Sequence, residues 1–233
     1  MRQLTVSIGG REYRLPELTV PMALDGMLPG DAEWEIEIGF GKGRYLIRRA
    51  EAEPERRFLG IEMASSYYRL ACRRMARRSV DNLILIRSEA LFAISALLPA
   101  GFASAVHVYF PDPWPKVRHQ KRRLFDPETV DLVLSLLRPG GQLFFATDCL
   151  DYGRLVREIL ESHPATRVTV LPGLWPDGPR TNYEVKYERA QRPILRLQVS
   201  WQPQTPSPVL HPQGEAGVLA ATSVRSEELD LSE

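Results

Sequence analysis

Cysteine is scarce in this chain of 233 residues, which contains only Cys72 and Cys149. Two cysteines cannot build a disulfide framework or a four-cysteine zinc site, so we expect a reduced, cytoplasmic protein. The chain also lacks the run of about 18 apolar residues that a membrane-spanning helix needs, and its first residues lack the apolar core of a secretory signal. The four histidines share no common spacing, so no metal site is predicted.

Net charge is also nearly absent, at +1, but it is unevenly distributed. The last 32 residues hold five acids and one base, a net charge of −4, which leaves +5 for the residues before them. This end of the chain contains four prolines and no aromatic residue, a composition typical of disorder. Arginine supplies 26 of the 30 basic residues, which suits phosphate recognition but is also explained by the base composition of a genome.

Strand and helix patterns alternate from Glu33 onward, which indicates βαβ units and a parallel sheet. We therefore predict three parts: an N-terminal extension over 1–32 with two weak strands, an α/β domain over 33–201, and a disordered acidic tail over 202–233. The expected helices are Arg44–Ala52, Ala64–Ser79, Ala90–Leu97, Phe125–Leu137 and Asp151–Ser162.

A glycine-rich turn follows the first strand of this domain, where Gly39, Gly41 and Gly43 are spaced G-x-G-x-G. Arg44 occupies the place of the third glycine of a dinucleotide-binding turn, which weakens the case for an NAD-dependent oxidoreductase. Glu37 lies two residues before the first glycine. A carboxylate there would not help to bind a pyrophosphate, but it suits a ligand with an ammonium group.

Carboxylates also end the next two strands. Glu62 follows the glycines by about 20 residues, where an acid can accept both hydroxyls of a ribose. Glu89 follows the third strand and could accept from an adenine amino group. A ligand with an ammonium, a ribose and an adenine but no phosphate is S-adenosylmethionine, which we predict as the cofactor.

A stiff loop follows the fourth strand, where Asp112 lies between Pro111 and Pro113 and precedes Trp114. Prolines restrict the backbone, and the carboxyl edge of a parallel sheet is where ligands bind, so we predict that Asp112 is catalytic. A basic stretch without acids comes next and is predicted to contact a polyanion. Its members are Arg118, His119, Gln120, Lys121, Arg122 and Arg123.

These segments, with Thr147-Asp148 and Arg180–Glu184, resemble the bacterial tRNA (guanine-N7-)-methyltransferase family over roughly residues 33–201. The resemblance implies a class I methyltransferase fold, α/β with a seven-stranded, mostly parallel, doubly wound sheet. It implies methyl transfer from S-adenosylmethionine to N7 of a guanine in the tRNA variable loop. Cofactor contacts would be Glu37, Glu62, Glu89 and Asp112; substrate contacts would be Lys116, Asp148, Thr181, Asn182, Tyr183 and Glu184.

The sequence departs from the family pattern at Glu89, Cys149 and Asn182, which bears on details of cofactor and RNA contact. The expected partner is tRNA, with no membrane and no obligate protein partner, and the chain is expected to act as a monomer or homodimer. Two alternatives stay open: a methyltransferase that acts on another amine or base, and a non-catalytic RNA-binding module. The first predicts activity without RNA, and the second predicts no cofactor binding.

Overall fold

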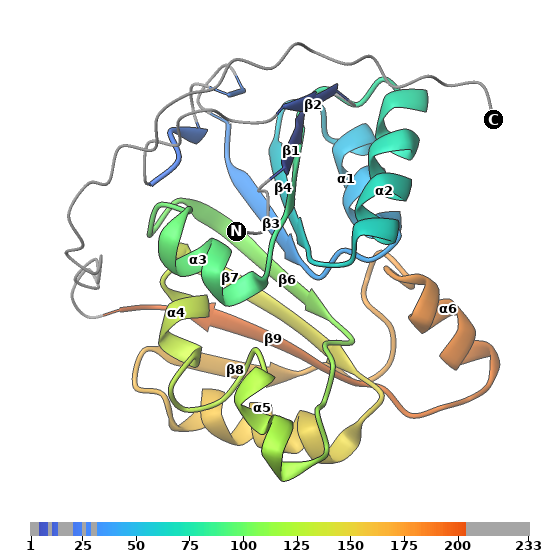
Figure 1. Ribbon diagram of the computed structural model, residues 1–233. Helices are drawn as coiled ribbons and strands as arrows, with labels where there is room; N and C mark the ends of the chain where they lie inside the picture. Colours follow the sequence, from blue (N-terminus) through green and yellow to red (C-terminus); the bar gives the residue numbers. More distant parts are fainter. Residues whose placement is uncertain (1–4, 9–10, 14–20, 25–26, 29–31, 204–233) are drawn as a thin grey trace.

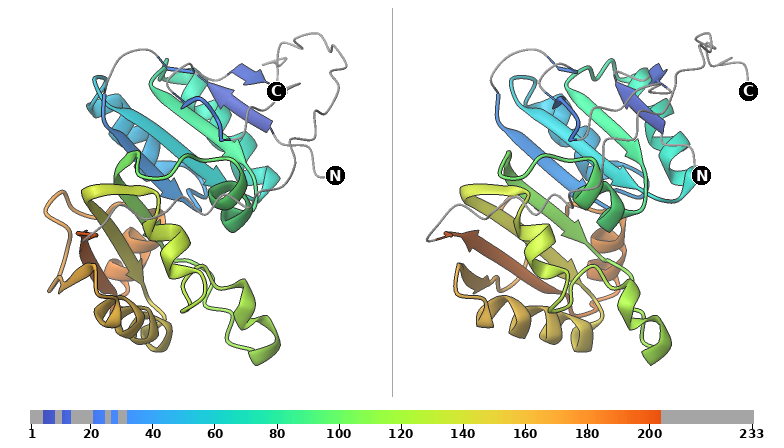
Figure 2. Two further views of the ribbon diagram at one scale, coloured as in Figure 1. Left: turned by 90° about the vertical axis from the view of Figure 1, so that its left-hand side faces the viewer. Right: turned by 60° about the vertical axis from the view of Figure 1, so that its left-hand side comes forward.

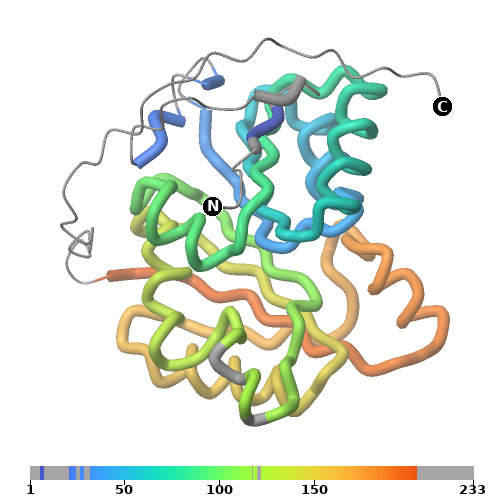
Figure 3. The backbone as a smooth tube through the Cα atoms, viewed as in Figure 1, coloured from blue at the N-terminus to red at the C-terminus, as the bar shows by residue number. Residues whose placement is uncertain are grey.

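The computed structural model describes residues 5–8, 11–13, 21–24, 27–28 and 32–203 (Figure 1). Most of the predicted acidic tail and parts of the predicted N-terminal extension lie outside the described residues. The described chain forms α-helices on both faces of one central sheet, and Figure 3 traces its path. No helix in this part of the chain combines the length and the apolar character needed to cross a bilayer.

Nine described strands form this sheet in the order β2-β1-β5-β4-β3-β6-β7-β9-β8. The five strands from β5 to β7 are parallel, and β9 runs antiparallel to both β7 and β8. Strands β3 to β9 thus form the predicted seven-stranded, mostly parallel sheet. The strands are β1 Thr5–Ile8, β2 Arg11–Tyr13, β3 Trp34–Ile38, β4 Arg57–Glu62, β5 Leu83–Arg87, β6 Ala103–Tyr109, β7 Leu137–Thr147, β8 Thr166–Val170 and β9 Leu195–Trp201.

Helices cover both faces because the central strands are apolar on both sides. Phe58 belongs to the core cluster that includes residues of α1 and α2, whereas its neighbour Leu59 belongs to the cluster that includes residues of α3, α4 and α5. Successive side chains of a strand point to opposite faces, so these helix groups lie on opposite sides of the sheet. The helices are α1 Arg44–Ala52, α2 Ser65–Arg77, α3 Ala90–Ala96, α4 Val130–Leu134, α5 Leu150–Ser162 and α6 Asn182–Arg189, with a 3₁₀ segment, η2, over Val117–Arg122.

The predicted helix Phe125–Leu137 is too long, because only Val130–Leu134 is α-helical. Asp126 caps the turn that precedes it by accepting from the N–H groups of Glu128 and Thr129 at 2.8 and 3.2 Å. The chain then enters β7 at Leu137 and continues through Gly140 and Gly141 as part of that strand. Pairing between β6 and β7 supplies the backbone partners that helix formation would otherwise have provided.

The described part of the N-terminal extension belongs to the same fold. Strand β1 pairs antiparallel with β5, and Val6 is fully buried in the core. Met22 is also buried there, and its N–H donates to the carbonyl of Leu97 at 2.7 Å. This segment therefore adds a hairpin to one edge of the sheet and packs beside α3.

Candidate active site

Five acidic residues lie at the carboxyl ends of the five parallel strands. In spatial order they lie at or just after the last residues of β5, β4, β3, β6 and β7, so the sheet brings them to one edge although they are spread over 112 positions. The chain order reverses between β3 and β6, and open α/β sheets bind ligands in the crevice at such a switch point. The residues are Glu89, Glu62, Glu37, Asp112 and Asp148.

Glu37 is the most deeply buried of the five, with 3% of its surface exposed. Its carboxylate accepts from the N–H of Leu46, but its Oε2 atom has no hydrogen-bond partner in the described structure. Burial, together with the negative charge of Glu62, raises the pKa of Glu37 to about 8. An unpartnered buried carboxyl is costly, and a cationic group bound beside it would restore the ionised form.

The glycine turn lies directly after this glutamate and leaves space above its backbone. Gly39 and Gly41 have φ angles of 76° and 54°, values that side chains other than glycine rarely adopt. A Cβ atom at either position would have no atom within 4 Å. The sequence therefore provides both a left-handed turn and an open cradle, which fits the predicted cofactor.

Glu62 shapes this cradle. Its carboxylate accepts from the N–H of Gly41 at 2.9 Å and from that of Ala64 at 2.7 Å. A carboxylate offers about four lone-pair positions, so these bonds leave acceptor capacity for the hydroxyls of a ribose. Glu62 thus fixes the turn and remains able to contact the predicted ligand.

Glu89 caps the next helix, because its carboxylate accepts from the N–H groups of Leu91 and Phe92 at 3.1 and 2.7 Å.

Two large apolar side chains lie close in sequence to Glu62 and Glu89 and remain exposed. Met63 is 58% exposed and Phe92 is 54% exposed. No sequence motif marks these two residues, although each follows a predicted contact by one to three residues.

The loop with Asp112 is rigid. Phe110 and Trp114 flank it with φ angles of 53° and 40°, in a region that costs non-glycine residues energy. Arg123 donates from Nε to the carbonyl of Pro113 at 2.8 Å and from Nη2 to that of Trp114 at 3.5 Å. The exposed Asp112 is therefore held between two restrained residues at the end of β6.

In the predicted RNA-binding stretch, some side chains pack against the Asp112 loop and others are exposed to solvent. Arg123 is half-buried and supports the loop, and His119 packs edge-on against Trp114. Arg118 and Arg122 are exposed, and Figure 2 shows that the segment with η2 projects from the body of the fold. Lys116 is also exposed, whereas the side chains of Gln120 and Lys121 lie outside the described part.

The predicted substrate motif forms the start of α6. Thr181 and Glu184 form a capping box, and Glu184 has no exposed surface. Glu184 accepts from the Trp175 indole at 2.7 Å, from Arg196 Nε at 2.9 Å and from the N–H groups of Arg180 and Thr181. Glu184 was predicted to contact the substrate, but its buried position keeps it out of reach of a base. Its hydrogen bonds instead hold the motif in position.

Other members of the motif face outward. Tyr183 is 51% exposed, and its ring lies 5.7 Å from that of Phe110 and 6.0 Å from that of Tyr187. Asp148 forms an ion pair with Arg192 at 3.1 Å and a hydrogen bond with Tyr187. Burial raises the pKa of Tyr183, and the charges of Asp112 and Asp148 raise it further. The ring of Tyr183 therefore lies close to both carboxylates. The remaining member, Asn182, is exposed and accepts from Arg44 Nη1 at 3.4 Å.

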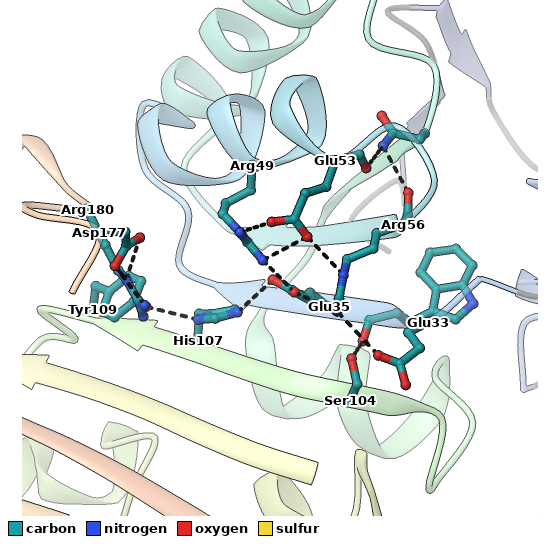
Figure 4. A network of polar contacts seen from close by, with 12 residues as sticks. Glu33, Glu35, Arg49, Glu53, Arg56, Ser104, His107, Tyr109, Asp177 and Arg180 are labelled. Carbon is teal, nitrogen blue, oxygen red and sulfur yellow. Dashed lines mark hydrogen bonds and ion pairs between the residues drawn. The ribbon is translucent and has the colours of Figure 1, made fainter. Parts of the chain in front are cut away.

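A buried polar network connects this motif with the centre of the sheet (Figure 4). Arg180 donates to the Tyr109 hydroxyl at 2.6 Å, Tyr109 bonds His107 Nδ1 at 2.9 Å, and His107 Nε2 bonds Glu35 at 3.2 Å. Since burial lowers the pKa of His107, the ring is neutral and donates from Nε2 to Glu35. Arg49 also bonds Glu35, and together these partners lower the pKa of Glu35 to about 2. Residues far apart in the sequence build this network, which no local motif predicts.

Comparison with known proteins supports the same interpretation. A family model described as "Putative methyltransferase" matches residues 31–197. The tRNA (guanine-N(7)-)-methyltransferase of Nitrosococcus oceani is 36% identical over 168 residues, which cover 72% of this chain and 71% of that protein. The enzyme of the same name from Alkalilimnicola ehrlichii is 37% identical over 75% of this chain and 73% of its own length.

Solved structures support the fold. The antibiotic-resistance methyltransferase Kmr matches 84% of this chain and 99% of its own, with a TM-score of 0.55 and 20% identity. The 16S rRNA (adenine(1408)-N(1))-methyltransferase from Catenulisporales acidiphilia, crystallised with SAM, matches 86% of this chain and 98% of its own, with a TM-score of 0.56 and 17% identity. These likenesses confirm the predicted class I methyltransferase sheet. Because sequence similarity covers most of both chains, this chain belongs to the tRNA (guanine-N7-)-methyltransferase family.

Proposed function

We propose that this protein transfers a methyl group from S-adenosylmethionine to N7 of a guanine in the variable loop of tRNA, in the cytoplasm. The observation that carries the proposal within the family is the buried carboxyl of Glu37, whose Oε2 atom has no partner, beneath an open glycine turn. The ammonium group of the cofactor would form the missing ion pair. Relatives named tRNA (guanine-N(7)-)-methyltransferase support tRNA as the substrate.

In this proposal the other residues of the edge have distinct binding roles. Glu62 would accept from the ribose hydroxyls, and Glu89 would orient the adenine. Met63 and Phe92, which leave apolar surface exposed beside these acids, would cover the faces of the adenine ring. When bound, S-adenosylmethionine supplies an electrophilic methyl group on its sulfonium.

Guanine N7 already carries an in-plane lone pair, so no residue needs to remove a proton from it. The guanine becomes cationic during the transfer, and negative charge near it lowers the barrier if that charge is in place beforehand. Asp112 would supply this charge, a role that its restrained loop supports, and Asp148 would add a second carboxylate at the next strand end. The exposed ring of Tyr183 offers a face for stacking, which also favours a cationic base.

A guanine in the folded core of tRNA must leave its stack before it can enter this edge of the sheet. Exposed Lys116, Arg118 and Arg122 would bind the surrounding phosphates without reading the sequence. Release of counterions from those phosphates would supply much of the affinity. The protein thus separates phosphate binding on η2 from base binding at α6 and the Asp112 loop.

Incubation with unfractionated tRNA and labelled S-adenosylmethionine, followed by nucleoside mass analysis, tests the proposal. The expected product is 7-methylguanosine, and its position is found by sequencing the modified tRNA. Methylation of small amines or proteins without RNA would favour another methyltransferase activity. RNA binding without cofactor binding would favour a non-catalytic module.

A further inference from the structure

Helix α2 has an unusual charge distribution. It contains four arginines and no acidic residue. Two basic residues near its C-terminal end interact with neighbouring groups: Arg74 donates to the carbonyl of Lys42 at 2.8 Å, and Arg78, just past the helix, pairs with Glu51. The other three helical arginines are exposed and form no hydrogen bond or ion pair within the described part of the chain; they are Arg69, Arg73 and Arg77.

These three residues form one stripe, called here the α2 arginine stripe. They are spaced four residues apart, which places them along one side of the helix over about 12 Å. The core-facing side is occupied by Tyr68, Ala71, Cys72 and Met75. The stripe is therefore a continuous cationic surface that faces solvent.

Helix α5, unlike α2, carries acids that pair with its exposed arginines. Arg157 of α5 pairs with Glu161, and Arg154 pairs with Asp151. In α1, Arg49 pairs with Glu53. An arginine-rich composition alone would add arginines to all helices without removing the acids from one of them. The absence of acids from α2 is thus a property of that helix.

The stripe also lies near the proposed active site. Helix α2 begins three residues after Glu62. Burial raises the pKa of Tyr183 of α6, and the exposed Tyr67 of α2 lies close enough to Tyr183 to raise it further. Figure 1 shows α2 extending away from the edge of the sheet where α6 lies. A long polyanion bound at that edge would pass over this helix, on the opposite side of the crevice from η2.

We propose that the α2 arginine stripe is a second phosphate-binding surface for the body of the same tRNA. This inference rests on the proposed function, because it takes the partner to be the RNA whose guanine enters the active site. The charge of the stripe and its lack of internal partners fit phosphate groups. The two cationic surfaces would hold the RNA on either side of the site and fix the position of the target base.

The test replaces all three arginines, as Arg69→Gln, Arg73→Gln and Arg77→Gln. Affinity for purified tRNA is measured by fluorescence anisotropy over a range of salt concentrations. We expect binding to weaken by about tenfold to a hundredfold at 0.1 M salt, and the slope of log K against log salt to flatten by about two to three units. The triple Lys variant should keep most of the affinity because it retains the charge.

A matched control removes the same charge elsewhere, as Arg138→Gln, Arg157→Gln and Arg167→Gln. Arg138 and Arg167 lie at the starts of β7 and β8, at the other end of the sheet from the site. Melting temperature and cofactor affinity establish that each variant is folded. If the α2 variant binds tRNA with the same affinity and salt slope as the control, the proposal is overturned. That result would leave the proposed function intact, which fails only if the wild-type protein forms no 7-methylguanosine.

Discussion

Strand β3 carries two buried glutamates, one toward each end, whose hydrogen bonding differs and whose pKa values shift in opposite directions. Glu35 and Glu37 lie two residues apart, point to the same face and are each less than 5% exposed. Glu35 is bonded by His107, Arg49 and other internal donors, and its pKa falls to about 2. Glu37 has one oxygen without a partner, and its pKa rises to about 8.

The two glutamates are similarly buried, so the difference lies in their partners: a fully bonded carboxylate supports the fold, whereas one with a free oxygen can bind a ligand. At the amino side of the crevice, carboxylate, imidazole, phenol and guanidinium groups satisfy one another and hold the Arg180 segment in place. At the carboxyl edge, Glu37 is left with capacity for an external cation, and Asp112 is exposed on a restrained loop. The following predictions test this division.

The largest effect is expected at Asp112. Asp112→Asn keeps the shape of the side chain but removes its charge, so the fold and most tRNA affinity should persist. The single-turnover rate at saturating tRNA and cofactor should fall by about 10²–10³, as when a preorganised electrostatic group is lost. Asp151→Asn, which changes an exposed aspartate on α5, serves as the control. An unchanged rate for Asp112→Asn would move the catalytic role to Asp148.

The next effect concerns the paired glutamate. Glu35→Gln removes the charge that faces Arg49 and His107, and we expect a loss of about 2–3 kcal/mol in the free energy of unfolding at pH 7. This is less than a fully buried pair would lose, because Arg49 keeps 28% of its side chain exposed. Chemical denaturation measures it.

This loss should shrink in acid. The pKa of Glu35 is lower in the folded protein than its ordinary value of 4.5, so its contribution is present above that value and disappears as the pH falls toward about 2. Cofactor affinity of the folded Glu35→Gln protein should stay near wild type. A strong loss of cofactor affinity without a loss of stability would reverse the roles assigned to the two glutamates.

Glu37→Gln should have the opposite phenotype. Loss of a charge-assisted bond to the cofactor ammonium should weaken cofactor binding by about tenfold to a hundredfold, measured by calorimetry. The stability of the ligand-free protein should not fall, because the variant removes a buried carboxyl that lacks a partner. Wild-type cofactor affinity in this variant would exclude Glu37 as the ammonium contact.

The smallest expected effect is the release of a proton when the cofactor binds. Because the pKa of Glu37 is about 8 without ligand, its carboxyl is mostly protonated at pH 7, and a bound ammonium would favour ionisation. Cofactor binding at pH 7 should therefore release up to about one proton, detected by calorimetry in buffers of different ionisation enthalpy. The ligand-free protein should also lose stability as the pH rises from about 4.5 to 8. Both effects should be absent from Glu37→Gln.

Local sequence patterns predicted the sheet and the residues that lie at its carboxyl edge. Alternating apolar strands and amphipathic helices predicted βαβ units, and the glycine turn, Glu62 and the Pro-bounded Asp112 marked the carboxyl edge, because these signals are local. The carboxyl ends of parallel strands meet at one edge of the sheet regardless of the length or conformation of the connecting segments. The helix α6 was missed although its capping box, Thr181 to Glu184, is a local signal.

Which polar residues support the fold and which remain available depends on contacts between segments far apart in the chain. Glu35 and Glu37 look equivalent in the sequence, and so do Arg122 and Arg123. Their roles depend on partners that only the folded chain supplies: His107 reaches Glu35 across 72 positions, and Arg123 bonds the carbonyl of Pro113, ten positions away. Since the free energy of a buried charge is set by the donors packed around it, no spacing along the chain could assign these roles.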